Sequence, residues 1–407
     1  MGTNIRLWLK YHRNKIFNSI AFYPAIIVMA FLVLSILSIT FDFSEMGMQI
    51  KSHLQRFSLR DASTARSIIS SITAGIFTLT VFSFSMVMIV LNQTASQLSN
   101  RILDRLIGSR FQQLVLGIYV GTIIYSLFLL STIRDIDQGI QIPALSTYLL
   151  ILLTVLDIFL FIYFLHFITQ SVKYEVIIQR VMEETKTSLE HACKLEQPPP
   201  ESISFESECL ITAAKSGIYQ GFDKQVLIRI CNDNNCVLQL MQSLGTFVLI
   251  GAPVIKVNKK LPNDILKAIQ NEVYLQSSES IKENFFFGFR QLTEMAVKAL
   301  SSGINDPGTA IQSIRALFQL YAYRVHFFPE STIKNSELQV KIILIELTFE
   351  QIFKDTIYPI WDYGKEDRMV QNELHHLLEI FLTTAPDAKI AWTLLHKVKL
   401  KLKDASH

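Results

Sequence analysis

A row of small polar side chains crosses one of the long apolar stretches of the chain, with the spacing of a helix face. Its members are separated by four or seven residues: Ser67, Ser71, Thr78, Ser85, Asn92 and Ser96. Because an α-helix turns by about 100° per residue, these intervals place all six on one side of a helix. Ala74 and Gly75 lie near that side, and the opposite face is expected to be bulkier, with Ile69, Ile76, Phe84 and Val87.

This row has two interpretations. In the first, small residues let neighbouring helices pack closely and their hydroxyls hydrogen bond across the contact. In the second, copies of the helix from several subunits line a water-filled pore with rings of hydroxyls. Arg60 projects from the same face beyond the outer end, where it would favour anions at the mouth of a pore. The two interpretations can coexist.

A single carboxylate, Asp157, lies near the centre of the fourth apolar stretch. A charged carboxylate at this depth costs about 2.5–3.5 kcal/mol on insertion scales, so it must face protein or water, or be protonated. Thr122 and Tyr125 of the third stretch fall at similar depth, and either could hydrogen bond to it. Structural hydrogen bonding and an ion or proton relay remain alternative roles.

Two glycines of the third stretch, Gly117 and Gly121, have the spacing of a small-residue packing motif. Glycines one turn apart remove side-chain bulk from one helix face, which lets a second helix approach. We therefore expect a close helix contact at this point.

The elements that must position these residues are four apolar stretches in the first part of the chain, residues 20–41, 68–91, 112–132 and 146–169. A helix rises about 1.5 Å per residue, so about 20 residues cross the roughly 30 Å hydrocarbon layer. The sequence therefore predicts an α-helical polytopic membrane domain with four transmembrane helices over residues 1–170.

Charge predicts the orientation of these helices. Lys and Arg are enriched before the first stretch, between the second and third, and after the fourth, although the loop between the first and second also carries several. By the positive-inside rule both termini are expected in the cytoplasm. Four cysteines without paired spacing are expected to be reduced thiols, which fits a cytosolic second half.

Composition narrows the function classes. The chain of 407 residues is 50% hydrophobic and 18% charged, which is too apolar for a disordered protein. A net charge of +3 gives little support to a nucleic-acid partner. No metal-ligand spacing, phosphate loop or nucleophile motif is present, so we expect no enzyme activity, no metal and no cofactor.

The second half is expected to be a cytosolic α+β domain. An extended helix and proline-rich linker would occupy residues 171–204, a small β-rich module 205–260, and a helical module 261–407. Within the last, helices are predicted over residues 262–276 and 331–358, among others. Asn305, Asp306 and Pro307 are typical of a helix start, with Asp306 as the N-cap and Pro307 at the first helical position.

This helix start has a second interpretation. A helix N-terminus presents free N–H groups that can hold an anion. Arg290, Glu294 and Asp306 would then form a ligand site in the cytosolic domain.

Three stretches resemble a family of bacterial predicted membrane proteins, the domain of unknown function 2254. They are residues 117–134 (GIYVGTIIYSLFLLSTIR), 216–257 (from SGIYQGFD to GAPVIKV) and 287–317 (FGFRQLTEMAVKALSSGINDPGTAIQSIRAL). The resemblance implies a multi-pass inner-membrane protein with four spans and a cytosolic domain, and it implies no known activity. The chain departs from the family pattern at Ser302 and Gly303, and at Glu283 and Asn284, where an Asp usually precedes the Phe-Gly pair.

Together these features favour a homo-oligomeric inner-membrane ion channel, lined by the second transmembrane helix and gated or filtered by the cytosolic domain. One alternative is a membrane-anchored sensor or scaffold whose cytosolic domain binds a ligand or protein partner. A second alternative is a proton-coupled carrier that uses Asp157. The expected partners are the lipid bilayer, further copies of the chain and small ions.

Overall fold

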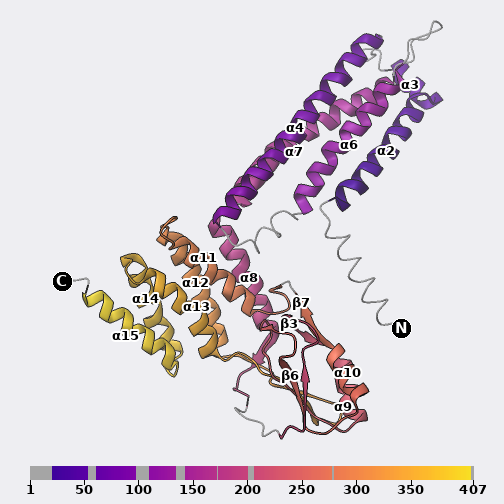
Figure 1. Ribbon diagram of the computed structural model, residues 1–407. Coiled ribbons are helices and arrows are strands. Elements are labelled where there is room, and N and C mark those ends of the chain that lie inside the picture. The colour runs from indigo at the N-terminus through magenta and orange to yellow at the C-terminus, as the bar shows by residue number, and fades with distance from the viewer. Residues whose placement is uncertain are drawn as a thin grey trace. The chain divides into compact units, whose positions relative to one another are not determined.

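The computed structural model describes residues 21–53, 61–97, 110–133, 143–171, 173–199, 206–276 and 279–404. The chain divides into two compact units, Met1–Lys173 and Tyr174–His407 (Figure 1).

Among its described residues, the first unit contains four helices that are long and apolar enough to span a membrane: α2 (Phe22–Asp42), α4 (Ala62–Gln97), α6 (Arg110–Thr132) and α7 (Ala144–Ser171). This confirms the prediction of four spanning helices. Helix α6 contacts the other three, and α7 does the same, so α2 and α4 lie on opposite sides of the α6–α7 pair (Figure 1). A short helix, α3 (Glu45–His53), follows α2.

The contact between α2 and α6 is built around the two glycines of α6. A Cβ atom added to Gly117 would lie 2.7 Å from Cδ1 of Ile27 and 3.0 Å from Cα of Pro24. A Cβ atom added to Gly121 would lie 2.6 Å from the ring of Phe31. Both glycines therefore face α2, at distances that leave no room for a side chain.

Six helices of the second unit pack together. They are α8 (Tyr174–Ala192), α11 (Phe286–Ala299), α12 (Pro307–Arg324), α13 (Phe349–Gly364), α14 (Arg368–Thr384) and α15 (Lys389–Asp404). Aromatic rings of α11 to α14 contact one another within this group, where those of Phe289, Tyr321 and Phe353 stack or tilt against one another. Helix α8 packs on α11 and α12, where Thr185 meets Gly288.

The strands of the second unit form three sheets. The largest has the order β2 (Cys209–Thr212), β6 (Pro253–Val257), β4 (Leu238–Leu240), β10 (Val340–Ile343) and β9 (Thr332–Lys334). A second sheet has the order β5 (Phe247–Val248), β3 (Gly217–Phe222) and β7 (Val273–Gln276), and a third pairs β1 (Cys193–Leu195) with β8 (Phe328–Pro329). Helices α9 (Lys224–Asp233) and α10 (Asn263–Asn271) pack beside these strands (Figure 1).

Two predicted helices were wrong in part. The helix expected over residues 262–276 ends at Asn271, and the next residues form β7, which pairs with β3. The helix expected over 331–358 is replaced in its first half by β9 and β10, and α13 begins only at Phe349. Pairing partners distant in sequence decide these segments, because strand formation depends strongly on tertiary context. Strands from both sides of residue 260 therefore share sheets.

Candidate functional site

The polar row lies on the outside of the first unit. Its described members are exposed: Ser67, Ser71, Thr78, Ser85 and Asn92. On the opposite side of α4, Ile69, Ile76 and Val87 are buried against the other helices of the unit. Phe84 was wrongly expected on that side: it directly precedes Ser85 of the row, about 100° around the helix, and is exposed. Ser96 lies within α4, but its side chain and the whole of Arg60 lie outside the described residues.

The hydroxyls of the row bond to their own helix. The Thr78 hydroxyl donates to the Ala74 carbonyl at 2.8 Å, and the Ser85 hydroxyl donates to the Val81 carbonyl at 2.9 Å. A Cβ atom added to Gly75 would meet nothing within 4 Å among the described atoms. The described helices of the chain therefore leave this face of α4 uncovered.

Asp157 is completely buried between α4, α6 and α7. Its carboxylate interacts electrostatically with the Tyr119 hydroxyl, and the Thr122 hydroxyl is placed to donate to it. Ser83 of α4 lies within hydrogen-bonding reach of Tyr119 and is also fully buried. The structure thus gathers Ser83, Tyr119, Thr122 and Asp157 from three helices, a group we call the Asp157 cluster.

Several polar atoms of the Asp157 cluster have no bonded partner. Within the part of the chain that the structure describes, neither oxygen of Asp157, nor the hydroxyls of Tyr119 and Ser83, has a hydrogen bond of regular geometry. The Thr122 hydroxyl donates to the Ile118 carbonyl at 3.1 Å. Sequence spacing pointed to Thr122 but missed Tyr119, which lies almost one helical turn before it, and Ser83, which lies on the apolar side of α4.

Tyr125 belongs to a different network from the one predicted. Its hydroxyl donates to the Ser146 carbonyl at 3.0 Å and shares a hydrogen bond of 2.9 Å with the Ser38 hydroxyl. The Ser146 amide in turn donates to the Asp42 carboxylate at 2.7 Å. Tyr125 therefore joins α2 to the start of α7, which is distant along α7 from Asp157.

Arg290 and Asp306 of the second unit are engaged by different partners. Arg290 forms an ion pair with Glu279 at 3.3 Å. Asp306 caps α12 by accepting from the Thr309 amide at 3.1 Å and from its hydroxyl at 2.6 Å, and Pro307 occupies the first turn. Asn305 has a positive φ of 50°, and Glu294 is half-buried in α11. The carboxylate of Asp306 is thus engaged in capping its own helix.

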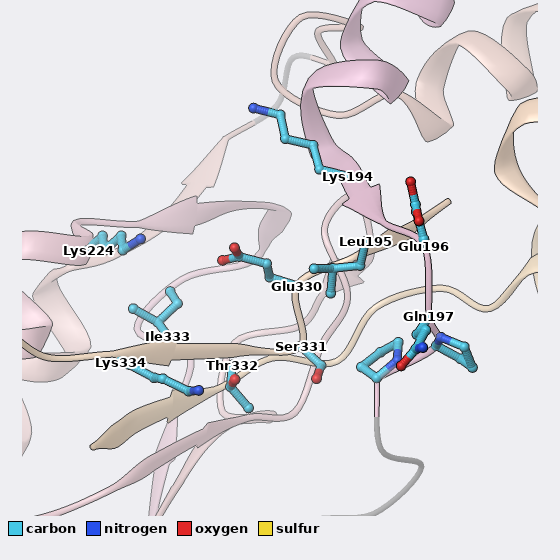
Figure 2. A pocket seen from close by; sticks show the side chains of 12 residues that line it. Lys194, Leu195, Glu196, Gln197, Lys224, Glu330, Ser331, Thr332, Ile333 and Lys334 are labelled. Atoms are coloured by element: carbon cyan, nitrogen blue, oxygen red, sulfur yellow. The ribbon is translucent and has the colours of Figure 1, made fainter. Parts of the chain in front are cut away.

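One hollow of the second unit has a volume of about 780 Å³ and lies beside β1 and β9. Figure 2 shows that Lys194, Lys224 and Lys334 enter its lining with ammonium groups that point to different places. Glu196 and Glu330 add negative charge. Because the cations do not converge, the hollow offers no obvious anion site.

A second cavity of about 440 Å³ is better enclosed by side chains that can recognise a ligand. It lies between β3 and the segment after β10, and its lining includes Tyr219, Tyr274 and Glu346. The Tyr219 hydroxyl is buried and has no hydrogen-bond partner among the described residues. Burial raises the pKa of Glu346 to about 7, and the nearby Arg324 guanidinium opposes this shift.

Comparison with known proteins agrees with the membrane-spanning first unit. The profile of a family described as "Predicted membrane protein (DUF2254)" matches residues 18–379. The chain belongs to the DUF2254 family. The match extends from the first span to α14 and so includes both units.

The relatives of this DUF2254 protein include mycobacterial proteins. It is 25% identical over 271 residues to the uncharacterised protein Rv1290c of Mycobacterium tuberculosis and to the uncharacterised protein Mb1321c of Mycobacterium bovis. The aligned region covers 62% of this chain and 51% of each relative, so the chain spans about half the length of the curated relatives it matches. No solved structure matches it.

Within the described ranges, no group of three or more His, Cys, Asp or Glu residues is placed to hold a metal ion. The features that remain are the exposed polar row of α4, the Asp157 cluster, and the cavity beside Glu346.

Proposed function

We propose that this protein is a homo-oligomeric ion channel whose pore is lined by the polar row of α4. The observation that carries the proposal is the exposure of Ser67, Ser71, Thr78, Ser85 and Asn92 in a helix whose opposite side is buried. One chain supplies only one such helix, so a pore requires several copies around an axis.

The dimensions of α4 suit this role. It has 36 residues, which corresponds to about 54 Å of helix, well beyond the roughly 30 Å hydrocarbon layer. A pore-lining helix of this length would carry the row through the whole bilayer. The channel would lie in the bacterial inner membrane with both termini in the cytoplasm, and the second unit would gate or filter ions there.

Cysteine accessibility along α4 tests the proposal. A membrane-impermeant thiol reagent should label Ser71→Cys, Thr78→Cys and Ser85→Cys in the assembled protein. The matched controls are Phe77→Cys and Phe84→Cys, because these side chains are 60% and 56% exposed but lie beside the row. Lipid would protect all five positions, whereas a wet lumen would leave only the first three reactive.

Recordings from purified protein in planar bilayers supply the second test. Unitary currents are expected, and labelling of Thr78→Cys with a charged reagent should reduce them while labelling of Phe77→Cys should not. The channel proposal is overturned if no current is seen at any salt, voltage or membrane tension and both sets of cysteines are equally protected.

The cavity beside Glu346 favours a second candidate, a membrane-anchored sensor. Two tyrosines and a half-buried carboxyl line it, and this mixture of aromatic and polar groups is typical of small-molecule sites. A screen of small polar metabolites by thermal shift of the full chain would test it. A genuine ligand should lose its effect in Glu346→Gln and keep it in Glu337→Gln, an exposed position between β9 and β10.

A further inference from the structure

We propose that the Asp157 cluster is a binding site for a single monovalent cation, an alkali-metal ion or a proton. The proposal concerns the interior of one chain. It is independent of the pore, because Ser83 lies on the buried side of α4 and the polar row on the exposed side.

The first argument is the number of unpartnered oxygens. Among the residues that the structure describes, both carboxylate oxygens of Asp157 and the hydroxyls of Tyr119 and Ser83 are fully buried without a hydrogen bond of regular geometry. Buried polar groups in folded proteins almost always have partners, so a set of four such atoms in one place points to an additional occupant.

The second argument is the origin of these oxygens. They come from α4, α6 and α7, three helices that contact one another. Tyr119 links the set, because its hydroxyl lies within hydrogen-bonding reach of Ser83 and within electrostatic range of the Asp157 carboxylate. Oxygen ligands from carboxylate and hydroxyl groups are those that hard cations prefer.

The third argument is charge. A carboxylate in the middle of a membrane needs a compensating positive charge or a proton. The other buried carboxylate of the described helices, Asp42, accepts from the Ser146 amide in a separate network. One negative charge therefore matches one monovalent cation, and an ion with two charges would be left uncompensated.

The experiment measures the thermal unfolding of the full chain in lipid nanodiscs as a function of NaCl, with choline chloride keeping the ionic strength constant. At alkaline pH, NaCl should stabilise the wild type in a saturable manner, because a ligand that binds only the folded state raises its stability. As the pH is lowered and protons compete with Na⁺ for the carboxylate, the apparent Na⁺ affinity should fall about tenfold per pH unit.

Four variants locate the site. Asp157→Asn should abolish the response to both Na⁺ and pH. Ser83→Ala and Tyr119→Phe, which each remove one oxygen, should weaken the apparent affinity about tenfold. Thr154→Val is the matched control, because the Thr154 hydroxyl lies about one turn before Asp157 but donates to the Leu150 carbonyl at 2.8 Å. It should respond as the wild type does.

The outcomes separate the two cations. Stabilisation by NaCl that is lost in Asp157→Asn assigns an alkali-metal ion. A pH response without an NaCl response, also lost in Asp157→Asn, assigns a proton. The proposal is overturned if the wild type responds to neither, or if Ser83→Ala and Tyr119→Phe respond as the wild type does. This last comparison decides the matter even if Asp157→Asn fails to fold.

Discussion

Replacing Gly121 by alanine should destabilise the first unit, and Gly75→Ala is its matched control. The added Cβ at Gly121 would lie 2.6 Å from two ring atoms of Phe31, whereas the one at Gly75 would meet nothing within 4 Å. Carbon atoms pack comfortably at about 3.5–4.0 Å, so the Phe31 ring or the α2 backbone must move by about 1 Å.

The magnitude follows from comparing the two variants. Overpacking of this kind costs about 1–3 kcal/mol. Alanine also raises helix propensity by about 1 kcal/mol over glycine, and this gain is common to both positions. We therefore expect Gly121→Ala to be less stable than Gly75→Ala by about 1–3 kcal/mol, the range of the steric term alone.

The assay is equilibrium unfolding in mixed micelles of a mild detergent and sodium dodecyl sulfate. The probe is the labelling rate of Val115→Cys, a fully buried position on α6, in a background without the four native cysteines. Low protein concentration keeps association from contributing. If Gly121→Ala and Gly75→Ala unfold at the same detergent fraction, the close contact between α2 and α6 is refuted.

Three further predictions concern single side chains. Tyr125→Phe should lower the stability of the first unit by about 1–2 kcal/mol, since it removes the hydrogen bonds to Ser38 and Ser146. Tyr163→Phe, at a 56% exposed position, is the control. Equal midpoints of detergent unfolding for the two variants would contradict the prediction. Asp306→Ala should cost about 0.5–2 kcal/mol through loss of the N-cap, seen as faster hydrogen exchange in the first turn of α12, whereas Asn305→Gly should change little because glycine accepts its positive φ. The pKa of Glu346 is about 7 in the folded state and 4.5 in the unfolded state. Between pH 4.5 and pH 7 the folded state therefore keeps a proton that the unfolded state loses. The stability of the folded state falls as the pH rises, by about 3 kcal/mol by pH 8. Glu346→Gln should therefore match the wild type in thermal melts at pH 4.5 and exceed it at pH 8, and parallel curves would disprove the assignment.

The sequence was sufficient to predict the four spanning helices, because hydrophobicity over about 20 residues determines insertion regardless of partners. It also placed Asp306 and Pro307 at a helix start, since capping is a local interaction. It did not predict β7, β9 and β10, whose conformation depends on strands far away in the chain.

The Asp157 cluster was predictable only in part. The carboxylate was evident as a charge within an apolar stretch, and Thr122 followed from antiparallel depth. Tyr119 and Ser83 were not, because their involvement depends on how α4 and α6 rotate about their axes, which side-chain packing decides. Tyr125 hydrogen bonds instead to Ser38 near the end of α2 and to the Ser146 carbonyl near the start of α7.

The parallel pairing of β10 with β4 has a consequence for biosynthesis. Ile342 and Ile343 pair with Leu238 and Gln239, and β10 lies between β4 and β9 in the five-stranded sheet. The ribosome must therefore add about a hundred residues after β4 before β10 can pair with it, a delay typical of sheets whose strands are distant in sequence. Until then the nascent chain exposes an unpaired strand edge, which makes this stage prone to aggregation.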